Sequence, residues 1–179
     1  MSATVIDAAS KHIPAIHKIY AHWVLNGLAS FEEVPPEVSE MDRRRLAVQE
    51  LKLPYLVAQD GSEVLGFAYA GPYRPRSGYR FTVEDSVYVA PGIHGRGIGR
   101  RLLSDVVARA EALGRLQMLA IIGDSGNAAS IGLHAALGFR QIGTMRSVGF
   151  KFGRWVDTVI MQRALGPGDG VLPKKVSQA

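Results

Sequence analysis

The segment Val87-Tyr-Val-Ala-Pro-Gly-Ile-His-Gly-Arg-Gly-Ile-Gly-Arg-Arg-Leu102 indicates which fold the chain adopts. It joins an apolar strand pattern, which ends at Pro91, to the start of an amphipathic helix. Between them lie three glycines at alternate positions, Gly95, Gly97 and Gly99. Glycine leaves backbone N–H groups unshielded, and the N-terminus of the following helix attracts negative charge. The segment therefore predicts a backbone-lined site for a phosphate or pyrophosphate group.

Two other phosphate-binding motifs do not fit this spacing. A P-loop needs Lys followed by Ser or Thr after its second glycine, where this chain has Ile98. The dinucleotide fingerprint G-x-G-x-x-G also fails, because the spacing here is G-x-G-x-G in the middle of the chain. A glycine-rich turn that binds no ligand remains an alternative. If an anion does bind, Arg96 and Arg100 would add positive charge beside the backbone.

The elements around this segment mix strands and helices without a regular βαβ order. Apolar spacing predicts strands near 3–8, 55–59, 63–71, 81–90, 116–122, 139–146 and 153–162, and helices near 13–24, 40–52, 98–113 and 127–137. We therefore expect an α+β domain with a mixed, largely antiparallel central sheet flanked by helices. This domain is expected to span residues 1–165, followed by a flexible, unstructured tail at 166–179.

Three local patterns refine this prediction. Ser39 is expected to cap the helix near 40–52. The strand near 81–90 places Val83, Asp85, Val87 and Val89 on one face. The helix near 98–113 has a stripe of residues expected to be buried, namely Ile98, Leu102, Leu103, Val106, Val107, Ala110 and Leu113.

Composition excludes several classes of protein. The 179 residues include no cysteine, which excludes a disulfide scaffold and thiol catalysis and suits a reducing cytoplasm. No stretch approaches the about 20 apolar residues of a membrane helix, and the N-terminus has no signal-peptide pattern. The net charge is +5, but the arginines are dispersed and no nucleic-acid motif is present. We expect a cytoplasmic protein with no membrane or nucleic-acid partner.

Several segments resemble one known family. His94-Gly-Arg-Gly-Ile-Gly99 resembles the pyrophosphate loop of GNAT N-acetyltransferases, with His94 where Gln or Arg is usual. The segment 127–139 is similar to the later cofactor-binding helix of that superfamily, and segments 79–89 and 149–157 resemble the phosphinothricin and methionine sulfoximine/sulfone N-acetyltransferases. The resemblance covers about residues 3–164. It implies splayed strands that form an acyl-CoA cleft, acetyl-CoA as cosubstrate without a metal, and a homodimer.

The resemblance also implies which residues bind ligands. Those expected at the cofactor are Val87, Tyr88, Val89, His94, Gly95, Arg96, Gly97, Ile98, Gly99, Arg100, Asn127 and Ser130. Those expected at the substrate are Phe31, Arg74, Arg76, Ser77, Gly78 and Tyr79. The loop at 74–79 is interpreted as a lid on a closed pocket, where arginine would bind a carboxylate in a bidentate manner. Solvated loop charges are the alternative.

Acetyl transfer from a thioester to an amine requires a deprotonated amine, a donor to the oxyanion and a proton for the thiolate. An α-amine with a pKa near 8 is only about a tenth deprotonated at pH 7, so a base accelerates the reaction. The resemblance implies Glu84 for this role, through water, and a solvent-facing glutamate is the alternative. Backbone N–H groups near 87–89 are expected to bind the oxyanion. His134 is the candidate proton donor, and a structural hydrogen bond is its alternative.

We therefore expect an enzyme that acetylates the α-amine of a small amino-acid-like molecule such as phosphinothricin, methionine sulfoximine or methionine sulfone. One alternative is acetylation of a protein N-terminus or of lysine, whose pKa near 10.4 demands more help from the base. The other alternative is a non-catalytic acyl-CoA-binding module, which would keep the glycine turn and lose the base.

Overall fold

The computed structural model describes residues 3–93 and 95–173, so the predicted cofactor residue His94 lies outside the described part. The strands are β1 (Thr4–Asp7), β2 (Tyr55–Asp60), β3 (Glu63–Pro72), β4 (Thr82–Val89), β5 (Gln117–Gly123), β6 (Arg140–Lys151) and β7 (Arg154–Ala164). The helices are α1 (Ile13–Asn26), α2 (Val38–Glu50), α3 (Ile98–Ala112) and α4 (Ala128–Ala136). Short 3-10 helices lie at Ser10–His12, Ser77–Tyr79 and Gly168–Gly170.

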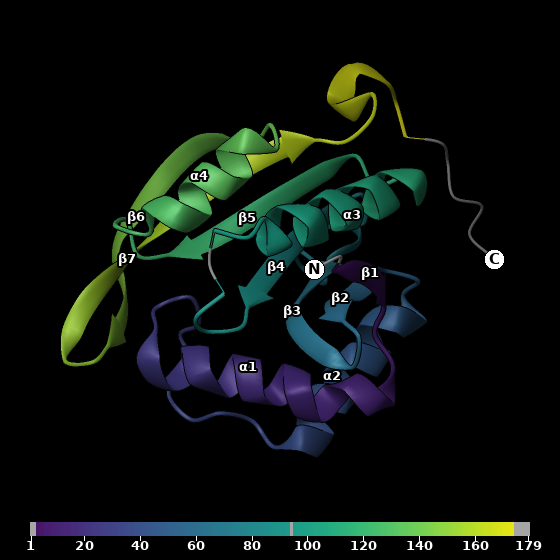
Figure 1. Cartoon of the computed structure of the whole chain (residues 1–179). Helices are drawn as coiled ribbons and strands as arrows, with labels where there is room; N and C mark the ends of the chain where they lie inside the picture. The colour runs from purple at the N-terminus through teal and green to yellow at the C-terminus, as the bar shows by residue number, and fades with distance from the viewer. Residues whose placement is uncertain (1–2, 94, 174–179) are drawn as a thin grey trace.

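The strands form one sheet in the order β1-β2-β3-β4-β5-β7-β6. Only β4 and β5 pair in parallel among the described strands, and the other neighbours are antiparallel. Helices α1 and α2 cover one face of the sheet, and α3 and α4 cover the other (Figure 1). The predicted α+β architecture with a mixed, largely antiparallel sheet is therefore confirmed.

Each face of the sheet has its own apolar core, and the helical spacing in the sequence explains both. In α1 the apolar residues at helical spacing, among them Ile16 and Val24, are buried together with Tyr55 and Phe67 of the sheet. In α3 the stripe from Ile98 to Ala110 is buried against the opposite face. Burial of such stripes stabilises the helices more than their intrinsic propensity does.

Several predicted details were wrong. Helix α2 begins at Val38 with Glu37 as its N-cap residue, because extended backbone continues through Glu37, so Ser39 lies inside the first turn and does not cap it. Helix α3 ends at Ala112, which leaves Leu113 exposed rather than on the buried stripe. Within the segment predicted to be unstructured after 165, Gly168–Gly170 form a 3-10 helix.

Strand β6 extends to Lys151, beyond the predicted end at residue 146. The pairing of β6 with β7 shifts register between Met145 and Gly149, and Ser147 there has a positive φ of 53°. This irregularity breaks the alternating pattern in the sequence, which is why the strand looked shorter. The added residues continue the hairpin, with Lys151 paired to Arg154.

Strands β4 and β5 separate halfway along their length, as Figure 1 shows. Their pairing runs from Thr82 with Gln117 to Asp85 with Ala120 and ends there. Beyond this point β4 continues along β3, and β5 continues along β7. The predicted splayed strands are therefore present. No helix in the described ranges is long and apolar enough to span a membrane.

Candidate active site

The opening between β4 and β5 is flanked by two cavities. The inner cavity, of about 210 Å³, is lined by β4, the end of β5, α4 and the connection between α1 and α2. The outer cavity, of about 460 Å³, is lined by β4, the glycine turn and the first residues of α3 and α4. Both cavities are lined by Ala29, Val87, Tyr88, Asn127 and Ser130. A ligand that fills the outer cavity would therefore reach the inner one beside these residues.

The glycine turn forms the wall of the outer cavity. Gly95 and Gly97 both have φ of 75°, and Gly97 is the N-cap residue of α3. This left-handed conformation favours glycine and turns consecutive backbone N–H groups toward one side. Arg96 and Arg100 line the same cavity. These donors at the start of a helix suit a pyrophosphate group, such as that of acetyl-CoA.

Most of the residues predicted to bind the cofactor line this outer cavity. They are Val87, Tyr88, Val89, Gly95, Arg96, Gly97, Ile98, Gly99, Arg100, Asn127 and Ser130. Asn127 is also the N-cap residue of α4, where its side-chain oxygen accepts a hydrogen bond from the Ser130 backbone N–H at 3.2 Å. Its amide N–H groups remain as potential donors to a ligand.

Glu84 lies in the inner cavity on the face of β4 that is turned toward α1 and α2. Its side chain is half-buried. Burial, and then the negative charge of the adjacent Asp85, raise the pKa of Glu84 to about 7. A carboxylate with this pKa can accept a proton near neutral pH, because its basicity approaches that of the amine it would serve.

His134 also lines the inner cavity, but both of its ring nitrogens have partners. Nε2 lies 3.0 Å from Oδ2 of Asp85, and Nδ1 lies 2.7 Å from the Ser130 carbonyl oxygen. His134 and Asp85 are both buried. The sequence predicted that His134 either donates a proton or makes a structural hydrogen bond. The structural hydrogen bonds are present, and the proton-donor role stays a prediction.

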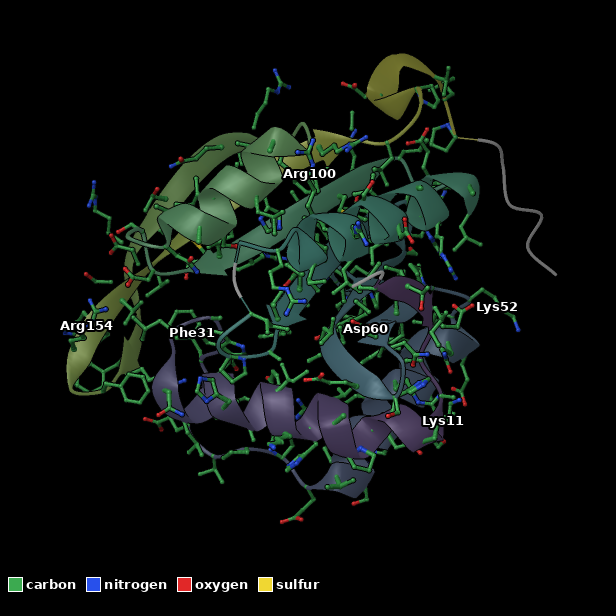
Figure 2. The ribbon with its side chains drawn as sticks, in the orientation of Figure 1. Lys11, Phe31, Lys52, Asp60, Arg100 and Arg154 are labelled. Carbon is green, nitrogen blue, oxygen red and sulfur yellow. The ribbon has the colours of Figure 1, made fainter. Side chains whose placement is uncertain are left out.

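The connection between α1 and α2 closes one side of the inner cavity. The ring of Phe31 packs so closely on Gly149 of β6 that an added Cβ there would lie 2.1 Å from it. Lys151, also on β6, is buried and donates hydrogen bonds to the carbonyl oxygens of Gly27 at 3.0 Å and Ser30 at 2.7 Å. In Figure 2, Phe31 lies on the side of the molecule that also carries Arg154 of the β6–β7 hairpin.

The predicted substrate loop lies elsewhere. Arg74, Arg76, Ser77 and Tyr79 line a separate cavity of about 330 Å³ together with Leu53, Val83 and Arg115, and Glu84 is not among its lining residues. Gly78 lines none of the three cavities. The interpretation of this loop as a lid on a closed pocket stays a prediction, because the loop lines a cavity other than the one that contains Glu84. The loop follows β3 at Pro72, which pairs with Val83 at the end of β4 away from the opening.

Comparison with known proteins assigns the family. The family model described as "Acetyltransferase (GNAT) family" matches residues 16–139. The chain belongs to the GNAT acetyltransferase family. The matched region contains β4, β5, the glycine turn, α3, α4 and the connection between α1 and α2, which line the two cavities of this GNAT protein.

Individual GNAT relatives match nearly the whole chain. A phosphinothricin N-acetyltransferase from Alcaligenes faecalis is 56% identical over 97% of this chain and 88% of its own length. An L-methionine sulfoximine/L-methionine sulfone acetyltransferase from Pseudomonas aeruginosa is 45% identical over 93% of this chain and 97% of its own. The crystal structure of a GNAT phosphinothricin acetyltransferase from Sinorhizobium meliloti in complex with acetyl-CoA has a TM-score of 0.94 and 46% identity, covering 99% and 97% of the two chains.

Sequence reasoning missed two polar residues of this GNAT site. Asp85 was placed on an apolar strand face, and a buried charge there requires a partner, so the pattern did contain a signal. Its partner His134 lies 49 residues away on another element, which the pattern does not reveal. Lys151 lies beyond the register shift in β6, and no local pattern indicates that it faces inward.

Proposed function

We propose that the protein transfers the acetyl group of acetyl-CoA to the α-amine of a small amino-acid-like substrate of the phosphinothricin, methionine sulfoximine or methionine sulfone type. The observation that carries this proposal is the position of Glu84. A carboxyl group with a pKa of about 7 lines a small cavity, which meets a larger cavity with a pyrophosphate-type donor set. The named activities of the relatives support the same substrate class.

Glu84 acts as the general base in this proposal. At pH 7 about half of the Glu84 carboxyl groups are ionised when the pKa is about 7. The carboxylate removes a proton from the amine, through a water molecule where the substrate does not reach it directly. The amine nitrogen then attacks the thioester carbonyl, and the C–S bond breaks as the amide forms.

The backbone of β4 supplies the polar contacts for the acyl group. Because β4 and β5 stop pairing after Asp85, the backbone of Ser86, Val87 and Tyr88 has no neighbour on that side among the described strands. Its N–H groups can bind the developing oxyanion, and its remaining groups can pair with the amides of a pantetheine arm as an added strand does. His134 or solvent returns a proton to the thiolate.

The carboxylate of the amino-acid substrate requires a cation that the inner cavity lacks. No Arg or Lys is among its lining residues within the described chain. We retain Arg74 and Arg76 for this role and place them in the site of the second subunit of a homodimer. The hairpin of β6 and β7 supports such a dimer, because Phe150, Phe152 and Trp155 are 55%, 57% and 64% exposed. Single-domain surfaces rarely carry such a cluster without a partner.

The first experiment is a thiol-release assay with acetyl-CoA and a panel of amines. The panel contains L-phosphinothricin, L-methionine sulfoximine, L-methionine sulfone, the common amino acids, a lysine peptide and a peptide with a free N-terminus. Saturable turnover of the small amines without turnover of the peptides is expected. Turnover of a peptide alone would replace the proposal by protein acetylation, and acetyl-CoA binding without any turnover would favour the non-catalytic module. Cytoplasmic localisation remains part of the proposal and is tested by cell fractionation.

A further inference from the structure

Asp85 and His134 form a buried pair whose protonation is constrained by its hydrogen bonds. The Ser130 carbonyl oxygen, 2.7 Å from Nδ1 of His134, only accepts hydrogen bonds, so Nδ1 must carry a hydrogen. Nε2 faces Oδ2 of Asp85 at 3.0 Å. One further proton must lie between these two atoms, either on the imidazole or on the carboxyl group. The pair is therefore neutral overall in both arrangements.

The direction of both pKa shifts agrees with this geometry. Burial raises the pKa of Asp85. Burial by itself lowers the pKa of His134, but the hydrogen bond and the charge of Asp85 outweigh it, so that the pKa of His134 is raised. A proton therefore remains on the pair at pH values at which a solvent-exposed histidine is neutral.

The Ser130 hydroxyl connects this pair to the cavities. Oγ of Ser130 lies 3.4 Å from Nδ1 of His134, a longer second contact on the side of the ring that carries the hydrogen. A hydroxyl oxygen that accepts from this N–H can direct its own hydrogen elsewhere. Ser130 lines both the inner and the outer cavity, so a hydrogen directed away from the ring can reach a group at their junction.

We propose that Asp85 is a positioning residue, which holds His134 in the Nδ1–H form and keeps a proton on the pair for delivery to the leaving thiolate through the Ser130 hydroxyl. This inference rests on the proposed function. As the C–S bond breaks, the Ser130 O–H donates its proton to sulfur, and Nδ1 of His134 passes its own proton to Ser130. The shared proton then stays on Nε2, which leaves a neutral ring beside the Asp85 carboxylate, and water returns one proton to Nδ1 and restores the neutral pair. The proton of the amine leaves through Glu84.

A serine nucleophile does not fit the same three residues. In a Ser-His-Asp triad the imidazole nitrogen next to the hydroxyl lacks a hydrogen and accepts one from it. Here that nitrogen is Nδ1, and its hydrogen is fixed by the Ser130 carbonyl oxygen. The imidazole therefore acts as a donor toward Ser130, which favours proton delivery over formation of an acyl-serine.

The variant Asp85→Asn tests this role, because the Asn amide can still donate to Nε2 but brings no charge and no additional proton. We expect kcat at pH 8.5 to fall about 100-fold, the lower range for loss of a general acid, with the KM of acetyl-CoA unchanged. Ser130→Ala should lower kcat similarly, and the double variant should lose little more, because both act in one relay. The exposed Asp169→Asn is the matched control and should retain wild-type kcat.

The comparison is made at pH 8.5 because other groups of the inner cavity titrate at lower pH. Its titratable lining residues are Glu84, Asp85, Tyr88 and His134. The charge of Asp85 contributes to the raised pKa of Glu84, so Asp85→Asn also lowers that pKa. At pH 8.5 Glu84 is ionised in both proteins, and the remaining difference reports on His134.

Nitrogen NMR of histidine in the wild-type protein tests the pair without relying on turnover or on a variant that must fold. The signal of His134, assigned by its loss in His134→Gln, should show a protonated Nδ1 from pH 6 to 9. A neutral Nε2–H tautomer would overturn the proposal. It would also be overturned if folded Asp85→Asn kept its kcat within threefold of wild type at pH 8.5. Absence of wild-type turnover with all amines would instead contradict the proposed function, and the NMR result would still stand.

Discussion

Replacing Glu84 by Gln removes the proposed general base while keeping the size of the side chain. The wild-type kcat/KM should rise with pH along a limb whose midpoint lies near 7, because burial and the charge of Asp85 raise the pKa of Glu84 to about 7. In Glu84→Gln we expect kcat/KM at pH 8 to fall about 100-fold, which is typical for loss of a positioned base. The only limb left should be that of the amine itself, near pH 8.

The same substitution should stabilise the fold at alkaline pH, because the folded state raises the pKa of Glu84. The ordinary pKa of a glutamate side chain is 4.5 and the pKa of Glu84 in the folded protein is about 7, so the folded state resists ionisation. Wild-type stability is therefore fully present below pH 4.5 and decreases as the pH rises through 7. For full burial the loss would be about 3 kcal/mol, and screening of this partly exposed group reduces it to about 1–2 kcal/mol. Glu84→Gln should gain that amount at pH 8 and nothing near pH 4.5.

Steady-state kinetics from pH 5.5 to 9.5 and urea unfolding at pH 5 and pH 8 measure both effects. A matched control is Glu63→Gln, an exposed acid at the start of β3, which should change neither. The reasoning is refuted if the wild-type acid limb has its midpoint below pH 5.5, or if Glu84→Gln retains kcat/KM within threefold. If the two proteins differ in stability by the same amount at both pH values, the raised pKa of Glu84 is refuted, but its role as the base is not.

Two further predictions address the walls of the site. Lys151→Met leaves the Gly27 and Ser30 carbonyl oxygens without their donor, so the free energy of unfolding in urea should fall by about 1–3 kcal/mol. The KM of the amine should rise more than that of acetyl-CoA, and an unchanged amine KM would contradict the role of Lys151 in holding the α1–α2 connection. The exposed Lys18→Met is the control. Co-expression of Arg74→Ala and Glu84→Gln chains should restore activity in mixed dimers if Arg74 acts in the second subunit, since one site is then intact, whereas activity no higher than in either variant alone would exclude that arrangement.

The fold could be predicted from the sequence wherever one face of an element is buried against a continuous core. The stripes of α1 and α3 and the alternation of β4 follow directly from the spacing of apolar residues. The prediction failed where backbone conformation breaks the period, as at Ser147 in β6, and where extended backbone continues through Glu37 before α2. Such local exceptions depend on tertiary contacts that the pattern does not contain.

The candidate site also has parts that the sequence predicts and parts that it does not. The glycine turn and the cofactor residues of β4 and α4 are close in sequence or on one strand, and the structure brings them to one cavity. The substrate loop at 74–79 was assigned by resemblance, and its place relative to Glu84 depends on where β3 and β4 end. Contacts across the sheet, such as that of Lys151 with the α1–α2 connection, were not predictable from any one segment.

The two adjacent carboxyl groups of β4 acquire different chemistry from strand geometry alone. Successive side chains of a strand point to opposite faces, so Glu84 faces the α1 and α2 side and Asp85 the α3 and α4 side. The gap between β4 and β5 lets one cavity reach both faces, and both residues line it. Glu84 stays open enough to exchange a proton with an amine, whereas Asp85 is sealed against His134. The charge of Asp85 also raises the pKa of Glu84, so the residue proposed to hold a proton for the thiolate helps its neighbour to accept one from the amine.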